Sequence, residues 1–409
     1  MDQQPYELPD VWEWKSLKDI CDFENGDRGK NYPSRDAFVE KGIPVINAGN
    51  LNGWTVDSAG LNYINEERYN LIGGGKIKRG DILYCLRGSL GKCGIVDSID
   101  RGVIASSLVI VRPSNEIIKE LLLYYFNSSL SSHFVTHYNN GAAQPNLSAK
   151  SLSLFKIPLP PLSEQKRIVE KLDCLISRID QAVNHLQESL GLAEALFASE
   201  LNIMFSVIED RQEIAALAEV KGGKRLPKGC QLQDEKTDYP YIRVSDFNDN
   251  GSIDVLNVKF ITKEVQEKIS RYTITNQDLY ISIAGTIGKT GFVPQELDGA
   301  NLTENAAKLV IKNKDTLFLN YLYYFTKTSD FATQAGLATK QVAQPKLALT
   351  RLSKIQIPLC DISQQKRIVK KLDQVAKNKE ELKDKLQGQI DDLNALKASL
   401  LDAAFRGDL

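Results

Sequence analysis

Two stretches of the chain carry a long helical pattern of apolar residues. In the first, spacings of three and four alternate from Val169 through Leu172, Ile176, Ile179, Val183, Leu186, Leu190, Ala193 and Phe197. The second starts alike at Val369 and Leu372, loses the pattern over residues 377–380, and resumes through Leu382, Leu386, Ile390, Leu393, Leu396 and Leu400. This spacing predicts two helices with coiled-coil seams. Because a long helix cannot bury its seam alone, we expect the two helices to pair, in parallel or in antiparallel orientation, unless the seams serve a plain dimerisation coiled coil.

Nearly the same sequence precedes both seams. Residues 157–173 read IPLPPLSEQKRIVEKLD and residues 357–373 read IPLCDISQQKRIVKKLD. Each copy predicts a strand end, a turn, and a helix with Ser163 or Ser363 as its N-cap. Upstream, residues 80–97 match 277–294, residues 124–126 match 323–325, and residues 143–147 match 343–347. The chain therefore reads as two copies of one unit, a globule followed by a long helix.

The residues before each helix favour a mixed α/β fold. Short strand-like runs at 43–51 and 239–247 lead into turns rich in Asn, Asp and Gly, and the stretches 116–138 and 315–334 carry aromatic residues at helical spacing. We predict an α/β (α+β) chain with an internal pseudo-two-fold repeat. Its expected segments are globular domains at 1–156 and 209–356 and spacer helices at 157–208 and 357–409.

Composition limits the kinds of site that the chain can hold. The 51 basic and 52 acidic residues nearly cancel, so a nucleic-acid surface must be local or completed by a partner. Six cysteines without a CxxC pair and three histidines argue against zinc fingers and a disulfide framework. His133 and His137 lie four apart but lack an HExxH pattern, so we expect no metal. Without a membrane-length apolar run or a secretory signal, the expected location is cytoplasmic.

Two glycine-lysine loops look like phosphate-binding loops, but neither matches the P-loop sequence pattern. A P-loop needs GxxxxGK[ST], but Ile283 stands where the first glycine is required, and Cys93 follows Gly91-Lys92. Residues 87–92 and 284–289 are better interpreted as hairpin turns. The sequence also lacks GxSxG, HExxH and the Asn/Asp-Pro-Pro-aromatic tetrapeptide of amino-methyltransferases. We therefore expect the chain to catalyse nothing by itself.

Together these repeated sequence motifs make the chain resemble the specificity subunits of type I restriction-modification systems. The resemblance covers the whole chain and rests on residues 158–173, their copy at 358–373, ASLLDAAFRGDL at 398–409, and an N-terminal Leu-Pro-x-x-Trp. It implies a DNA-reading subunit with two target-recognition domains, one for each half of a bipartite target, and two antiparallel helices that set the gap. Two adenine methyltransferase subunits with S-adenosylmethionine are expected on the helices. Restriction subunits with ATP and Mg²⁺ are expected to join them, and no cofactor is expected on this chain.

Matched loop positions are the predicted DNA contacts, although each is equally readable as an ordinary solvated loop residue. In the first domain they are Arg28, Lys30, Asn47, Asn50, Arg87, Ser89 and Lys92. In the second they are Lys224, Arg225, Arg243, Ser245, Thr286 and Lys289. The repeated residues at the helix starts are predicted partner contacts on a surface used twice, or else parts of a helix cap: Gln165, Arg167, Gln365 and Arg367.

Two other interpretations stay open. The chain could be the DNA-reading subunit of a related system that only methylates, or that cuts on both sides of its target, because nuclease and motor would lie on other chains. It could also be a coiled-coil adaptor with two peptide-binding heads. The adaptor interpretation predicts that the chain has no salt-sensitive affinity for duplex DNA.

Overall fold

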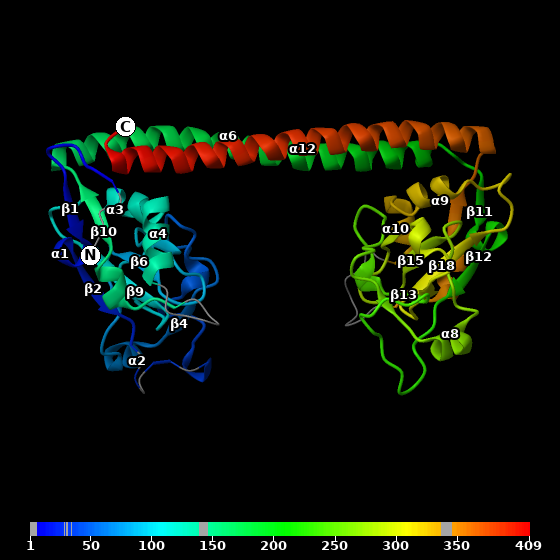
Figure 1. Cartoon of the computed structure of the whole chain (residues 1–409), viewed down its shortest axis with the longest axis horizontal. Coiled ribbons are helices and arrows are strands. Elements are labelled where there is room, and N and C mark those ends of the chain that lie inside the picture. Colours follow the sequence, from blue (N-terminus) through cyan, green and yellow to red (C-terminus); the bar gives the residue numbers. More distant parts are fainter. Residues whose placement is uncertain (1–5, 28, 30–31, 34, 139–145, 337–345) are drawn as a thin grey trace. The chain divides into compact units, whose positions relative to one another are not determined.

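A computed structural model describes residues 6–27, 29, 32–33, 35–138, 146–336 and 346–409. The chain divides into two compact units, the first made of residues 1–186 with 387–409 and the second of residues 187–386. Each contains a mixed α/β globule and parts of both long helices (Figure 1). The unit boundaries lie inside the helices, so each unit combines one predicted domain with the beginning of one predicted spacer helix and the end of the other.

The first unit is built on two four-stranded sheets. One has the order β2 (Cys21–Asn25), β9 (Leu108–Pro113), β6 (Ile82–Cys85), β7 (Cys93–Ile95), with antiparallel neighbours throughout. The other has the order β4 (Asn62–Ile64), β3 (Ile43–Ile46), β8 (Gly102–Ile104), β5 (Lys76–Ile77), in which β3 and β8 run parallel. A separate pair joins β1 (Glu13–Ser16) to β10 (Lys156–Leu159). The short helices are α1 (Leu17–Ile20), α2 (Glu66–Leu71), α3 (Lys119–Phe126), α4 (Ser129–Tyr138) and α5 (Ala149–Ser153).

The second unit repeats this plan. Its antiparallel sheet has the matching order β12 (Ala218–Gly222), β18 (Ala306–Ile311), β15 (Leu279–Ser282), β16 (Thr290–Phe292). A three-stranded sheet has the order β14 (Lys259–Phe260), β13 (Pro240–Ile242), β17 (Asn301–Leu302), and β11 (Arg211–Glu213) pairs with β19 (Gln356–Pro358). The short helices are α7 (Ile214–Leu217), α8 (Lys263–Ile269), α9 (Leu319–Phe325), α10 (Ser329–Ala335) and α11 (Leu349–Ser353). The predicted mixed α/β repeat is confirmed.

One part of the predicted repeat alignment is wrong by one residue. The Tyr124 hydroxyl donates to Asp173 and the Tyr324 hydroxyl donates to Asp373, so both members of each pair are 200 residues from their counterparts. Tyr124 therefore matches Tyr324, and the predicted match of residues 124–126 with 323–325 does not hold. The error arose because the two aromatic tripeptides look alike when shifted by one position.

The long helices are α6 (Leu162–Ser206) and α12 (Ile362–Arg406), each 45 residues and continuous. Ser163 and Ser363 lie inside them, so the predicted N-caps are wrong. In α12 the Asp361 carboxylate accepts the N–H of Gln364 at 2.9 Å and takes the capping role. In α6 Pro161 occupies that position, and its carbonyl accepts the N–H of Glu164 at 2.9 Å.

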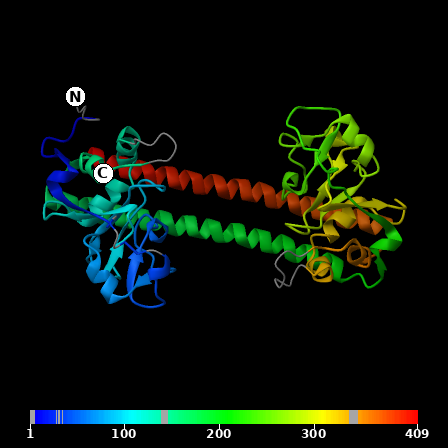
Figure 2. The ribbon, with the colours of Figure 1, turned by 90° about the horizontal axis from the view of Figure 1, so that it is seen from below.

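Within each unit the two helices run antiparallel, as predicted (Figure 2). In the first unit Arg167 contacts the carbonyl of Leu409 at 2.7 Å, and further along Asp180 pairs with Lys397 at 2.7 Å. In the second, Lys379 lies 5.1 Å from the Phe197 ring and Lys371 pairs with Glu200 at 2.7 Å. In both units residue numbers rise along one helix as they fall along the other.

The predicted seam of α12 is only partly right. Leu386 and Ile390 are buried, but Leu382 and Leu396 are 44% and 48% exposed. Lys397, four residues after Leu393, lies half-buried in the seam, with its ammonium on Asp180 and 4.8 Å from the Trp54 ring. A long cationic side chain can pack its aliphatic part and keep its charge paired, which apolar spacing does not reveal.

The end of each long helix belongs to the core of a globule. Phe405 of α12 is buried in the first unit, where its ring meets Tyr125 edge-on at 5.8 Å. Phe205 of α6 is buried in the second, with ring centroids 4.8 Å from Tyr321 and 5.8 Å from Phe325. Each core is therefore completed by a helix end.

Candidate nucleic-acid interface

The glycine-lysine loops are β-hairpin turns, as predicted. The first joins the antiparallel strands β6 and β7, with Gly88 and Gly91 at φ of +80° and +82°. The second joins β15 and β16, with Gly285 and Gly288 at +75° and +92°. Only glycine adopts such angles without steric strain, which explains the repeated glycines without a phosphate-binding role.

A small groove opens beside the first hairpin, and we call it the Arg87 groove. Its cavity of about 410 Å³ is lined by Asn25, Gly26, Arg87 and Asn146–Lys150. The Arg87 Nε donates to Asn146 Oδ1 at 3.1 Å, and the two residues form a β-bridge. The groove thus places a guanidinium, an amide side chain and the Lys150 ammonium on one surface. These groups suit a phosphate backbone and the edges of bases.

Asn146 and Lys150 are missing from the predicted contacts. Arg87 and Asn146 lie 59 residues apart in sequence. The sequence marked this segment by its repeat at residues 343–347 and by its amide side chains, but neither indicated that it lies against the hairpin.

The other predicted DNA contacts of the first unit differ in exposure and in hydrogen bonding. Ser89 is exposed at the hairpin tip, and Lys92 is half-buried where the hairpin ends. Asn47 begins a 3-10 turn (Ala48–Asn50), and its side-chain oxygen accepts the N–H of Gly49 at 2.8 Å. Asn50 is buried, accepts the N–H of Asn47 and donates to the Ala59 carbonyl, so its prediction as a DNA contact is wrong. Arg28 and Lys30 lie outside the described residues.

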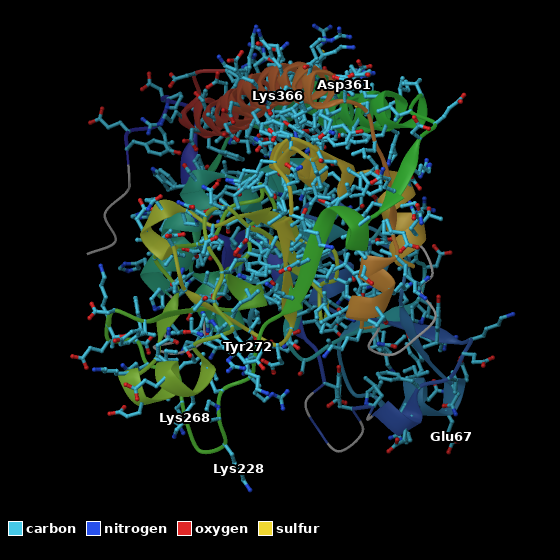
Figure 3. The ribbon with its side chains drawn as sticks, turned by 90° about the vertical axis from the view of Figure 1, so that its right-hand side faces the viewer. Glu67, Lys228, Lys268, Tyr272, Asp361 and Lys366 are labelled. Atoms are coloured by element: carbon cyan, nitrogen blue, oxygen red, sulfur yellow. The ribbon has the colours of Figure 1, made fainter. Side chains whose placement is uncertain are left out.

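In the second unit the exposed predicted residues are Lys224, Arg225, Ser245 and Thr286. Lys224 Nζ lies 5.5 Å from the Tyr272 ring, and Arg225 pairs with Glu304 at 2.6 Å. Exposed Lys228 and Lys268, with Tyr272, lie at the end of this unit away from Asp361 and Lys366 (Figure 3). We call Lys224, Arg225, Lys228, Lys268 and Tyr272 the basic end.

Two further predicted cations of the second unit, Arg243 and Lys289, are also paired within the fold. Arg243 is half-buried, binds the buried Asp246 carboxylate at 2.6 Å and donates to the Asn257 carbonyl, so it braces its own turn. Lys289 pairs with the exposed Asp249 at 2.7 Å, and this hydrogen bond lowers the pKa of Asp249. The Lys289 charge is therefore partly neutralised.

Buried ionisable groups in the two globules serve the fold. In the first unit Arg112 pairs with the buried Asp81 at 2.9 Å and also with Glu24. In the second, Lys308 pairs with the buried Asp278 at 3.0 Å. Burial lowers the pKa of Lys327, whose Nζ lies 5.1 Å from the Tyr323 ring. Across the described residues, no group of three or more His, Cys, Asp or Glu side chains is placed to hold a metal ion.

Two of the predicted partner contacts are internal. Gln165 and Gln365 are only 1% and 0% exposed, so a partner on the helix surface could not reach them, and this prediction is wrong. Arg167 is exposed and pairs with Glu164 at 2.6 Å, while Arg367 is also exposed. Of the two repeated pairs, only the arginines are accessible.

Known proteins similar to this chain share one description. The sequence model of the family described as "Type I restriction modification DNA specificity domain" matches residues 9–190 and 210–391. The EcoBI specificity subunit of Escherichia coli is 26% identical over 308 residues, which cover 69% of this chain and 62% of that protein, so the match spans less than two thirds of that relative. The StySPI specificity subunit of Salmonella potsdam is 21% identical over 428 residues, covering 98% and 90%.

Solved structures show the same fold. A chain from work titled "Structural basis underlying complex assembly and conformational transition of the type I R-M system" aligns with a TM-score of 0.77 at 20% identity, covering 99% of this chain and all of that one. The HsdS subunit of Thermoanaerobacter tengcongensis aligns with a TM-score of 0.53 at 21% identity, covering both chains fully. None of the described helices is long and apolar enough to cross a membrane. This chain belongs to the type I restriction-modification DNA specificity family, and it carries the family's domain twice.

Proposed function

We propose that this chain is the DNA-reading subunit of a type I restriction-modification complex and that each compact unit reads one half of a bipartite target. The observation that carries the proposal is the duplicated specificity domain. The two copies share strand order but expose different groups, the Arg87 groove in one and the basic end in the other. Different surfaces on one scaffold suit two different half-sites.

The long helices would set the gap between the half-sites. At 1.5 Å per residue, a helix of 45 residues is roughly 68 Å long. Two domains reading the same side of a duplex should lie about one helical turn apart, ~34–36 Å. Helices of this length reach beyond one such spacing, and their paired seams would resist bending.

Catalysis would belong to partner subunits. Two adenine methyltransferase subunits with S-adenosylmethionine would bind the helices, and restriction subunits with ATP and Mg²⁺ would join them. The net charge of −1 fits this division, because a protein that neutralised many phosphates by itself would be basic. We propose that the methyltransferases supply much of the phosphate contact.

The test is a map of adenine methylation across the genome of the source cell with the gene intact and deleted. We expect deletion to remove one split motif, two short half-sites with a fixed gap. Unchanged methylation, together with no salt-sensitive duplex binding by the co-purified complex, would contradict the proposal. Cleavage of unmethylated target DNA by the same complex would separate a restricting system from one that only methylates.

A further inference from the structure

In the first unit, an extended segment crosses the glycine-lysine hairpin beside the Arg87 groove. Asn146 of this segment forms a β-bridge with Arg87. The N–H of the next residue, Leu147, donates to the carbonyl of Leu86 at 2.9 Å. Leu147 is buried and Asn146 is exposed, because neighbouring residues of an extended segment point to opposite sides. The backbone therefore fixes where the Asn146 side chain lies on the surface.

The second unit repeats this crossing with other side chains. Lys346 forms the β-bridge with Ala284. The N–H of Leu347 donates to the carbonyl of Ile283 at 2.8 Å. Leu347 is buried and Lys346 is exposed, as their counterparts are in the first unit. Residues 146 and 346 thus occupy equivalent places on the surfaces of the two units.

The two bridges keep the same backbone and change the chemistry that they expose. Ala-Gln-Pro precedes both positions and Leu follows both. The first bridge carries the guanidinium of Arg87 and the amide of Asn146, while the second carries the methyl group of Ala284 and the ammonium of Lys346. Each bridge therefore has one cation, and the first also has an amide. A repeated scaffold whose exposed side chains differ suits two half-sites of different sequence.

The side chains at these two positions suit the edges of different bases. An Asn amide pairs with N6 and N7 of adenine in the major groove, whereas a Lys ammonium pairs with O6 and N7 of guanine. The Arg87 Nε donates to Asn146 Oδ1 at 3.1 Å and so orients the amide. Because an amide oxygen has two lone pairs, Oδ1 can keep this bond and also accept the N6 amino group of adenine. An uncharged amide displaces no counterions, so its contribution lies in base contact and not in phosphate neutralisation.

We infer that residues 146 and 346 are equivalent base-reading positions, at which Asn146 selects adenine in one half-site and Lys346 selects guanine in the other. The inference rests on the proposed function and deepens it, because it names one side chain and one base in each half-site. The difference between the two half-sites then depends in part on which side chains occupy one repeated β-bridge.

The experiment exchanges the side chains of the two bridges without changing the charge of either. The R87A/N146K variant gives the first bridge the side chains of the second, and A284R/K346N does the reverse. Each full-length variant is co-expressed with its methyltransferase subunit. The complex is titrated against duplexes that differ by one base pair at a time from the target found by methylation mapping. R87A/N146K should change a preference for adenine into a preference for guanine at one position of one half-site, by at least tenfold. A284R/K346N should make the opposite change in the other half-site.

A control and a milder variant accompany the exchange. The N70K/R79A variant makes the same kinds of substitution at exposed positions of the first unit outside the groove and should leave every base preference unchanged. Asn146→Ala keeps Arg87 and should reduce the preference for adenine at least fivefold. The salt dependence of binding should stay the same, because no charge is removed. Thermal unfolding serves as the folding control, and Asn146→Ala decides the matter if an exchange variant does not assemble.

The outcomes separate the inference from the function on which it rests. A wild-type complex that methylates no bipartite target would overturn the proposed function and the inference with it. Where the wild-type target is bipartite, exchange variants that keep the wild-type base preferences would overturn the inference alone. Equal weakening on every duplex, which is the behaviour of a phosphate contact, would overturn it as well. So would a change of base preference in both half-sites from a single exchange.

Discussion

Gln165 and Gln365 hold the same loop in each unit with three side-chain hydrogen bonds. The Gln365 oxygen accepts the N–H of Phe318 at 2.9 Å, and its amide donates to the carbonyls of Thr316 and Cys360 at 2.9 and 2.8 Å. Gln165 makes the matching bonds to Ile118, Glu116 and Pro160. Each glutamine thus ties the start of a long helix to the residues just before α3 or α9.

We predict that Gln365→Ala destabilises the second unit by about 3 kcal/mol, because it leaves buried backbone groups without partners. Hydrogen exchange of the amides in β15 and β18 would measure the loss. Gln364→Ala, at the exposed neighbouring position, should change protection by less than about 0.5 kcal/mol. Equal effects of the two substitutions would show that the internal bonds contribute nothing.

The Arg112 pair makes the first unit sensitive to acid. Burial raises the pKa of Glu24, but hydrogen bonds from Arg112 and from the N–H groups of Lys76 and Gly75 outweigh it, so the pKa lies below its ordinary value of 4.5. A lowered carboxyl pKa adds stability above the unfolded value, and that stability is lost as pH falls through the folded value.

Arg112→Gln should lower the unfolding free energy of the first unit by about 3 kcal/mol at pH 7, because it leaves the buried Asp81 carboxylate without its cation. The difference from wild type should narrow as pH falls below 4.5, which denaturant titrations at several pH values would measure. Arg101→Gln breaks the exposed pair with Glu66 and should change the unfolding free energy far less, because solvent screens that pair. A constant difference across the pH range would argue against this role of the pair.

At the scale of elements, each long helix completes a core with its last turns. Phe405→Ala should destabilise the first unit by about 3–5 kcal/mol, because it empties a packed aromatic site, and should leave exchange protection in the second unit unchanged. Phe205→Ala should do the reverse. Hydrogen exchange resolved by unit would measure both variants. Loss of protection in both units from either substitution would contradict this assignment.

The helix pattern shows which parts of an element a sequence can predict. The seam from Leu172 to Ile179 is buried as its spacing predicted, because regular apolar positions on a helix need a partner. Leu382 and Leu396 fit the same pattern and remain exposed, while Lys397 takes a seam position through its pairing with Asp180. Gln165 was predicted as a surface contact because a polar residue on a helix is usually exposed. Its burial depends on the loop that it holds, and the helix pattern does not show that loop.

The helix pair can also be shortened to test its proposed role as a spacer. Removing one heptad from each helix, residues 183–189 and 383–389, keeps the seam in phase and shortens the pair by ~10 Å. We predict a target whose gap is about three base pairs shorter and whose half-sites are unchanged, at ~3.4 Å per base pair. Methylation mapping in cells that carry the variant would measure the gap. An altered half-site would contradict the spacer role.

At the scale of the whole molecule, the internal repeat and the family could be predicted from the repeated sequence motifs. The surface that each unit exposes could not be predicted from them. Arg87 was predicted from its place on a hairpin. Its association with Asn146 and Lys150 depends on a contact across the domain that no local pattern contains. Asn50 shows the opposite error, because its side chain is buried and bonded within its own turn, which its residue type does not reveal.

The Arg87 groove gives the last prediction. Arg87→Ala with Lys150→Ala should raise the Kd of the assembled complex for its target about tenfold and reduce the salt dependence of binding, because two phosphate-seeking cations are removed. If each unit reads one half-site, any loss of sequence preference must fall in a single half. Arg79→Ala, an exposed position in the turn at the opposite end of β6, is the matched control and should change neither quantity. Duplex titrations at several salt concentrations would measure affinity, and methylation mapping would locate the relaxed half. Relaxation in both halves would show that the first unit does not read its half-site independently.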